Sequence, residues 1–277
     1  VLYSPAFGQY RAFQPGGACG LGSAPLHRKA TPKNVDVMGL VRGTHEVFVA
    51  RSDQDIEAAQ ALRALAFGLD VTHDRDAFDT TQHQILVRDL RNGQIVCCFR
   101  TRVFIGAQLE QSYAAQFYDL SGLSGFDGQM MELGRFCVHP DASDPDIVRM
   151  AWAALTRFVD ACGIKLMFGC SSFAGRVVAD YADSFALLRA RHLGPAVWRP
   201  AEKASDPVRF ADHARAQPDL QKAMQHMPPL LRTYLLMGGW VSDHAVVDQH
   251  MKTLHVFTGL EIDAIPENRK RLLRGLA

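Results

Sequence analysis

The sequence feature that most constrains the fold is a strand-like run at residues 132–140 (ELGRFCVHP), which stops where a helix signal begins. The run alternates like a strand, yet it places Glu132 and Arg135 in an otherwise apolar segment, where a buried charge is costly unless it is paired or used. Asp144 and Pro145 then supply a helix cap and a proline at the first helical position. We therefore expect a strand-to-helix junction that carries ligand or catalytic groups.

The segments on either side of this junction predict a mixed sheet with helices on both faces. Asn92 and Gly93 suit the positive φ angles of a tight turn and indicate an antiparallel hairpin. The other segments are assigned from their hydrophobic periodicity and from their capping residues. The expected strands are 45–51, 84–89, 95–104, 132–140, 165–173, 241–247 and 254–262, and the expected helices are 52–66, 145–162, 178–192 and 228–237.

Length and composition fit one large domain. The chain has 277 residues, of which 48% are hydrophobic, and this is enough for a sizeable core. Residues 1–44 are rich in Gly and Pro without periodicity, so we expect a poorly ordered extension there. The domain should span 45–265, and 266–277 should form a frayed basic tail.

Charge and cysteine content exclude several classes of protein. Thirty basic residues against 29 acidic ones give a net charge of +1, which argues against a strong nucleic-acid binder. The cysteines lack C-x-x-C or metal-site spacing, so we expect reduced core residues of a cytoplasmic protein and no metal. The start of the chain lacks a signal-peptide pattern, and no apolar stretch reaches the roughly 18 residues that span a bilayer. A soluble or peripheral protein is expected.

Several motifs, in order along the chain, resemble a known group of enzymes. The first helix, the acidic loop after it, the hairpin and the run at 132–140 are similar to the GNAT superfamily of acyltransferases. Within it, the chain resembles the branch that uses acyl carrier protein, which includes ornithine N-acyltransferases and acyl-homoserine-lactone synthases. The runs 165–173 and 227–248 resemble the ornithine family, and the likeness covers roughly residues 46–265.

This resemblance implies an α/β, GNAT-like fold with a central mixed, mostly antiparallel sheet. It also implies transfer of a 3-hydroxyacyl chain from acyl carrier protein to the α-amine of ornithine, which forms lyso-ornithine lipid. No cofactor would be bound, because the phosphopantetheine arm belongs to the carrier. Two alternatives stay open: the same chemistry on glutamine, lysine, glycine or a homoserine lactone precursor, and a non-catalytic module that binds lipid or carrier protein.

Residues 141–146 (DASDPD) indicate which kind of acyl donor the protein uses. Relatives that use acetyl-CoA carry a glycine-rich loop here, whose backbone amides hold the pyrophosphate. An acidic stretch without glycine favours a carrier-protein donor instead. Carrier proteins are acidic, so a basic patch should dock them, either at Arg149, Arg157 and Lys165 or in the tail at 269–271.

The acyl transfer needs a general base, because an α-amine is mostly protonated near neutral pH. The resemblance assigns this role to Glu132, and a structural ion pair with Arg100 or Arg135 is the alternative. Those two arginines are candidates to hold the acceptor's carboxylate or the carrier's phosphate. Asp76 and Asp79 in the acidic loop are candidates for the second ammonium of ornithine, with ion pairs to the arginines as the alternative.

The donor side of the site rests on fewer signals. The resemblance matches Arg63 and Phe67 to the helix end that contacts the donor or carrier. The alternative for Arg63 is a solvent-exposed arginine without a functional role. Phe104 is a candidate for the acyl pocket or the core, and the backbone at Val138 is a candidate to contact the donor carbonyl. The apolar helix 228–237 suits a core position, and peripheral membrane contact is the alternative.

Strand parity conflicts with these roles. Glu132 and Arg135 would point to opposite faces of a regular strand. A β-bulge shifts the alternation, and Gly134 is a plausible position for it. We therefore predict a bulged strand in which Glu132 and the backbone of 136–138 face the donor carbonyl, with a backbone N–H as oxyanion donor.

Overall fold

The computed structural model describes residues 39–213 and 217–277. Most of the predicted extension therefore lies outside the described residues. Its last part does not fit the prediction, because β1 (Leu40–Arg42) pairs antiparallel with β2 (His45–Val49) at the edge of the sheet. The predicted boundary at 44 is wrong, since a three-residue edge strand is too short to show a periodic signal.

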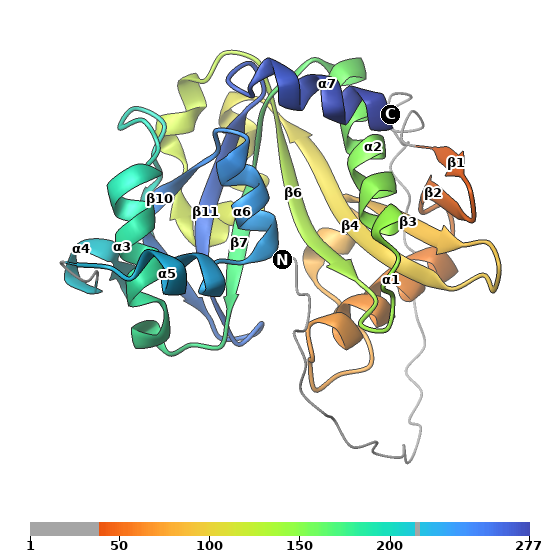
Figure 1. Ribbon diagram of the computed structural model, residues 1–277, viewed down its shortest axis with the longest axis horizontal. Coiled ribbons are helices and arrows are strands. Elements are labelled where there is room, and N and C mark those ends of the chain that lie inside the picture. The colour runs from red at the N-terminus through yellow and green to blue at the C-terminus, as the bar shows by residue number, and fades with distance from the viewer. Residues whose placement is uncertain (1–38, 214–216) are drawn as a thin grey trace.

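A nine-stranded sheet runs through the molecule in the order β1-β2-β3-β4-β6-β7-β11-β10-β9 (Figure 1). Every neighbouring pair is antiparallel except β6 and β7, which run parallel. The predicted mixed, mostly antiparallel sheet is thus confirmed. The remaining strands are β3 (His83–Asp89), β4 (Ile95–Phe104), β6 (Gln129–Val138), β7 (Ile164–Ala174), β9 (Pro207–Arg209), β10 (Trp240–Asp248) and β11 (Thr253–Glu261), and the separate pair β5 (Tyr118–Asp119) and β8 (Ala201–Glu202).

Helices lie on both faces of the sheet, as predicted. On one face, α2 (Pro145–Cys162) and α6 (Pro229–Leu236) share one apolar cluster with β2, β3, β4, β6 and β7. On the other face, α1 (Asp53–Ala66) packs on β3, β4 and β6, and the 3₁₀ segments between β4 and β6 pack on β7 and β11. The remaining helical segments are η2 (Ala77–Thr80), η3 (Gly106–Gln111), η4 (Ala114–Gln116), η5 (Ser121–Gly125), η6 (Val178–Tyr181), α3 (Ala182–Arg191), α4 (Phe210–His213), α5 (Leu220–His226) and α7 (Glu267–Leu276), where η marks a 3₁₀ helix.

The local signals behind these elements act as expected. Ser52 caps α1 by accepting from the Asp55 N–H, and the Asp55 carboxylate accepts from the Ser52 N–H in return. Asp144 caps α2, which ends at Gly163 in the left-handed conformation, with a φ of 61°. Helix boundaries that depend on a cap were therefore predictable from neighbouring residues alone.

The C-terminal segment departs from the predicted frayed tail. It forms α7, which crosses beside α2 at the top of Figure 1. Arg274 holds it there through two bonds of 3.0 Å to the Asp160 carboxylate of α2. A ten-residue basic helix is marginal by itself, so this order comes from its packing on α2. Within residues 39–213 and 217–277, no helix is both long and apolar enough to cross a membrane.

β6 and β7 separate partway along their length, and this fork positions the site. Their parallel pairing ends where Glu132 lies opposite Phe168. Beyond that point β6 follows β4, whereas β7 follows β11. Gly169 lies at the fork, and a side chain there would overlap the carbonyl oxygen of Leu133. Glycine is therefore required for the two strands to approach this closely before they part.

Candidate active site

β6 carries the predicted bulge. Its register with β4 shifts by one residue, so that Arg135 and Phe136 together lie opposite Phe99. Arg135 has a φ of 51°, a left-handed conformation that costs a residue other than glycine about 1–2 kcal/mol. Gly134 is not the bulged position, because it still pairs with Arg100. The strain falls on an arginine, and such strain is typical of functional sites.

The bulge brings Glu132 and Arg135 to the same side of the sheet, which resolves the parity conflict. Both line a cavity that is walled mostly by polar side chains, called the polar cavity below. The intervening Leu133 and the following Phe136 enter the apolar cluster under α2 and α6. The other polar side chains of the cavity are Arg100, Tyr113, Ser172, Asp248 and His255.

Glu132 is buried and is held by neutral donors rather than by an arginine. Its Oε1 accepts from the Ala114 N–H at 2.8 Å, and its Oε2 accepts from the Tyr113 N–H at 3.0 Å and from the Gln82 side-chain amide at 2.8 Å. Burial raises the pKa of this carboxyl, and the two backbone donors oppose that shift. The net shift is upward, so the group takes up a proton more readily than an ordinary glutamate, as suits a general base.

The acidic loop and the arginines of the site form one buried ion-pair network. The Asp76 carboxylate accepts hydrogen bonds from both terminal nitrogens of Arg100, at 2.7 and 2.6 Å. Burial alone would raise the pKa of Asp76, but the Arg100 hydrogen bonds outweigh it and hold that pKa below its usual range. The other pairs join Arg63 to Asp74 and Asp79, Arg100 to Asp79, and Arg135 to Asp74 and Asp76.

This network changes the roles expected for three residues. Arg63 is fully buried, and its guanidinium also donates to Gln84 at 2.9 Å, so it has no surface with which to meet a carrier protein. Asp76 and Asp79 are each bonded to arginines, so the loop is not a free acidic patch for a substrate ammonium. For Asp76 and Asp79 the structure shows the ion-pair alternative, whereas Arg63 is a buried ion-pair residue rather than the solvent-exposed arginine of its alternative.

Arg100 keeps one donor free for a ligand. Its Nε is buried and has no hydrogen-bond partner among the described residues. This nitrogen lies 3.9 Å from the point where a Cβ on Gly134 would stand, so it is next to the backbone of β6 on the side that lines the polar cavity. An unpaired guanidinium N–H that lines a cavity is suited to an anionic group such as a carboxylate.

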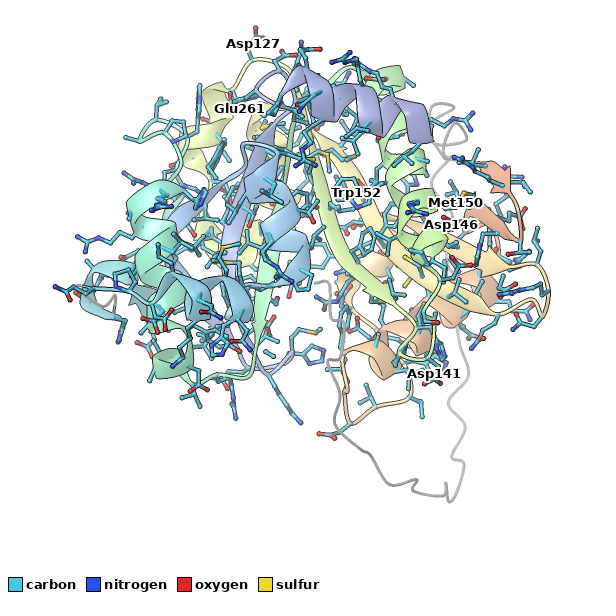
Figure 2. The ribbon with its side chains drawn as sticks, viewed as in Figure 1. Asp127, Asp141, Asp146, Met150, Trp152 and Glu261 are labelled. Atoms are coloured by element: carbon cyan, nitrogen blue, oxygen red, sulfur yellow. The ribbon has the colours of Figure 1, made fainter. Side chains whose placement is uncertain are left out.

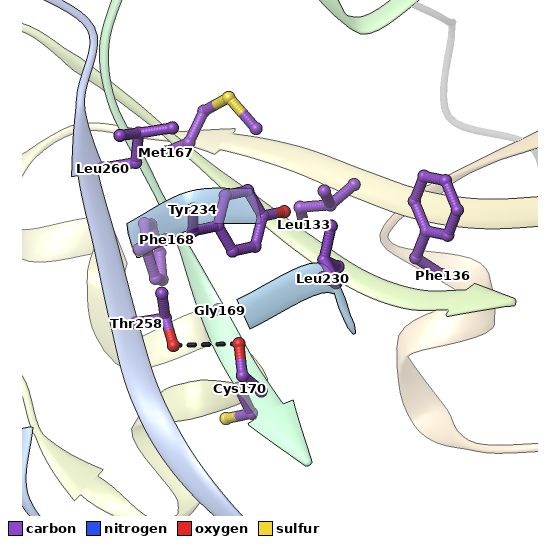
Figure 3. A pocket seen from close by; sticks show the side chains of 11 residues that line it. Leu133, Phe136, Met167, Phe168, Gly169, Cys170, Leu230, Tyr234, Thr258 and Leu260 are labelled. Atoms are coloured by element: carbon purple, nitrogen blue, oxygen red, sulfur yellow. Dashed lines mark hydrogen bonds between the residues drawn. The ribbon is translucent and has the colours of Figure 1, made fainter. Parts of the chain in front are cut away.

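A second, mostly apolar cavity lies on the opposite side of the fork (Figure 3). Leu133 and Phe136 of β6 form one wall, and Leu230 and Tyr234 of α6 form the other. Tyr234 also meets Trp152 of α2 edge to face at 5.9 Å, which braces α6 against α2. Helix α6 is thus a wall of this cavity, in agreement with its predicted core position.

The two cavities meet at the fork, because Leu133 and Cys170 line both of them. The backbone beyond the bulge is also directed here. The His139 N–H donates to the Val96 carbonyl of β4 at 2.8 Å. By strand alternation the Val138 N–H points away from β4, toward the side from which β7 has diverged. The fork thus combines an apolar cavity, a directed N–H and a buried carboxylate.

Other predicted residues lie away from the cavities. Phe104 is fully buried in the cluster beneath the 3₁₀ segments, where it packs on Phe168. Phe67 caps α1 and packs against the cluster under that helix. Phe104 is therefore a core residue, which was its alternative, whereas Phe67 is half-buried at the edge of its cluster. Each of the described cysteines is a free thiol, and the described residues contain no cluster that could hold a metal.

The sequence reasoning missed Tyr113, Asp248 and His255. Tyr113 lies in a polar segment without periodicity, and the two others lie in late strands far from the central run. The only available signal was an ionisable side chain inside an apolar strand, which Asp248 and His255 share with Glu132.

The residues before α2 keep their acidic character in the structure. Figure 2 shows Asp141 and Asp146 beside the start of this helix. The Asp144 carboxylate accepts from the Asp146 N–H at 2.9 Å, and Arg149 donates to Asp146. An aspartate of the chain therefore occupies a backbone donor that a phosphate would use at an open helix N-terminus.

Comparison with known proteins shows which family the chain belongs to. Residues 48–153 match the family described as acetyltransferase (GNAT) domain. The L-ornithine N(alpha)-acyltransferase of Rhodobacter capsulatus is 31% identical over 82% of this chain and 93% of that protein. The chain belongs to the L-ornithine N(alpha)-acyltransferase family. The protein of that name from Brucella abortus is also 31% identical, over 80% of this chain and 86% of its own length.

Among solved structures, FeeM, an N-acyl amino acid synthase from uncultured soil microbes, matches with a TM-score of 0.47. The two sequences are 9% identical, and the match covers 79% of this chain and 92% of FeeM. Membership of the ornithine acyltransferase family confirms the resemblance first noted from the motifs and makes this chain an N-acyltransferase.

Proposed function

We propose that this protein transfers a 3-hydroxyacyl chain from acyl carrier protein to the α-amine of ornithine and so forms lyso-ornithine lipid. The observation that carries the proposal is the fork between β6 and β7, where the apolar cavity and the polar cavity share Leu133 and Cys170. The acyl chain of a thioester donor is apolar and suits the first cavity, whereas an amino acid acceptor is charged and suits the second. The names of the curated relatives support ornithine as the acceptor.

In this reaction Glu132 takes a proton from the acceptor's ammonium, directly or through a water, and exposes the lone pair of the amine. The amine nitrogen attacks the thioester carbon. A C–N bond forms, the C–S bond breaks, and the electron pair leaves on the pantetheine sulfur. A second proton passes from the attacking nitrogen to this sulfur, which leaves as a thiol. The raised pKa of Glu132 is consistent with its role as proton acceptor.

Two further groups stabilise the reacting atoms. The Val138 N–H is directed into the opening beyond the fork, where it can donate to the oxyanion of the tetrahedral intermediate. The unpaired Nε of Arg100 binds the carboxylate of the amino acid on the other side. The acyl chain lies in the apolar cavity between β6 and α6.

The acidic start of α2 supports a carrier-protein donor over CoA. A CoA pyrophosphate would have to approach Asp141, Asp144 and Asp146, and the Asp146 N–H is already bonded to Asp144. A phosphopantetheine arm has one phosphate, which stays next to the carrier protein. The donor can therefore reach the fork without placing a pyrophosphate against these carboxylates.

The test is an acyl-transfer assay with purified protein. Acyl carrier protein loaded with a 3-hydroxyacyl chain, and the same chain on CoA, are each offered with ornithine, lysine, glutamine and glycine, and the products are identified by mass spectrometry. Acylornithine from the carrier-bound donor is the expected product. Acylation of another amino acid in its place would overturn the acceptor assignment. A faster reaction with CoA would overturn the donor assignment, and no product from any pair would refute the function.

A further inference from the structure

The polar cavity contains a second buried carboxylate, Asp248, which the proposed reaction does not use. It stands at the end of β10 and is 4% exposed. Its Oδ2 accepts from the Tyr113 hydroxyl and its Oδ1 from the Met251 N–H, each at 2.9 Å. Both donors are neutral, so the negative charge of Asp248 is solvated but not cancelled, and a cation would be attracted to it.

Two carboxylates in the polar cavity have no arginine partner in the described part of the chain. The three aspartates of the acidic loop are matched by the three arginines of the buried network. Among residues 39–213 and 217–277, this leaves Glu132 and Asp248 in the cavity without an ion pair to a lysine or an arginine. Two unmatched carboxylates in one cavity favour a ligand that brings two ammonium groups.

His255 of β11 adds an unpaired acceptor to the same wall. It is 1% exposed, and its Nδ1 lies 3.1 Å from the Tyr118 hydroxyl. That hydroxyl donates its hydrogen to the His255 carbonyl oxygen at 2.9 Å, so Nδ1 must be the donor to the hydroxyl oxygen. In the neutral ring Nε2 is then a bare acceptor, and it has no partner among the described residues. Burial lowers the pKa of His255 to about 4, which keeps the ring neutral.

We propose that Asp248 and the Nε2 of His255 together bind the side-chain ammonium of the acceptor and so select a diamino acid. Asp248 supplies the charge, and His255 supplies a second, directional acceptor for an ammonium that has three N–H donors. This assignment rests on the proposed function, because it places an amino acid acceptor in the cavity. It replaces the acidic loop, whose carboxylates are bonded to arginines.

Tyr113 sets the spacing between the two ammonium positions. Its backbone N–H donates to Glu132 and its hydroxyl donates to Asp248, so one residue spans the two carboxylates. An acceptor whose α-amine meets Glu132 would extend its methylene chain along the tyrosine side chain toward Asp248. The guanidinium of Arg135, 4.9 Å from the ring centroid, holds the ring in place.

The experiment compares ornithine with norvaline, which is ornithine without its terminal ammonium. For each variant, kcat and KM are measured for both acceptors with the carrier-bound donor, and both acceptors are also mixed in one reaction. Asp248→Asn keeps the shape but removes the charge, and His255→Asn keeps an N–H for Tyr118 while it removes Nε2. Each variant should lower kcat/KM for ornithine by about 10- to 100-fold, mainly through KM, and leave norvaline within a few-fold.

The matched control is Asp243→Asn, which removes a half-exposed carboxylate from the same strand and should leave the ornithine-to-norvaline ratio unchanged. The mixed reaction reports this ratio whatever fraction of a variant folds. A wild-type ratio in both Asp248→Asn and His255→Asn would overturn the assignment while the proposed function stands. Failure of the wild-type protein to acylate any amino acid would instead remove the proposed function itself.

Discussion

Replacing Glu132 with glutamine separates the role of a base from that of a structural acceptor. The carboxylate accepts three hydrogen bonds, from the N–H groups of Tyr113 and Ala114 and from the Gln82 side chain. A glutamine has the same shape, but one of its terminal atoms is a donor. It can turn that donor toward the Gln82 Oε1, which is buried and unpaired, if Gln82 flips.

The cost in stability follows from this count. In either orientation of Gln82, one of the three original donors faces the new NH₂ group and loses its acceptor, which costs about 1–3 kcal/mol. Loss of a general base lowers the rate by about 10²- to 10⁴-fold. Glu132→Gln should therefore melt a few degrees lower, remain folded and lose most of its kcat, while its affinity for acyl carrier protein is unchanged.

The assay measures kcat by release of the carrier thiol, stability by urea unfolding, and carrier binding by calorimetry. Ser184→Ala is the matched control, because it removes a buried 2.9 Å bond to Ala223 far from the cavities. It should cost comparable stability and leave kcat intact. The wild-type rate should fall with decreasing pH as Glu132 is protonated, from a higher pH than for an ordinary glutamate, and the variant should lack this step. A variant with kcat within threefold of wild type would refute the role of Glu132.

Four further predictions follow from burial and packing. Arg63→Met should destabilise the fold by about 3–5 kcal/mol in urea unfolding, because only Arg100 and Arg135 would then remain to neutralise the three aspartates of the buried network. Arg274→Ala removes a half-exposed ion pair and should leave the free energy of unfolding nearly unchanged in the same assay. Gly169→Ala should lower the melting temperature, since its methyl group would overlap the Leu133 carbonyl and force the fork apart; an unchanged melting curve would contradict the close approach. His255 has a pKa of about 4 against an ordinary 6.5, so between these values the unfolded chain binds a proton that the native state does not. Stability should therefore fall by about 3 kcal/mol from this group as pH drops from 6.5 to 4, and His255→Asn should remove that part of the pH dependence.

The elements of the fold were predictable where a signal lies within a few neighbouring residues. The hairpin at Asn92 and the capping box at Ser52 each depend on local geometry, and the structure agrees with them. The parity of Glu132 and Arg135 even predicted a bulge. Its position one residue beyond Gly134 was not predictable, because it depends on the pairing of β6 with β4.

The partners of the charged residues were harder to predict than their presence. Asp76 and Asp79 were candidates for the acceptor and Arg63 for the donor or carrier, yet the structure commits them to ion pairs with one another and with Arg100. A sequence shows which side chains carry charge but not which of them meet after burial, because that choice depends on long-range packing.

The sequence by itself determined the order of the longer strands and helices, the buried carboxylate of the central strand and the family of the chain. These properties depend on residue type and on short-range spacing. The tertiary structure alone decided where the cavities lie and which distant residues share them. Tyr113, Glu132, Asp248 and His255 come from four separate segments, and only the fork between β6 and β7 gives them a common cavity. The pairing of strands distant in sequence sets that geometry, and no local pattern encodes it.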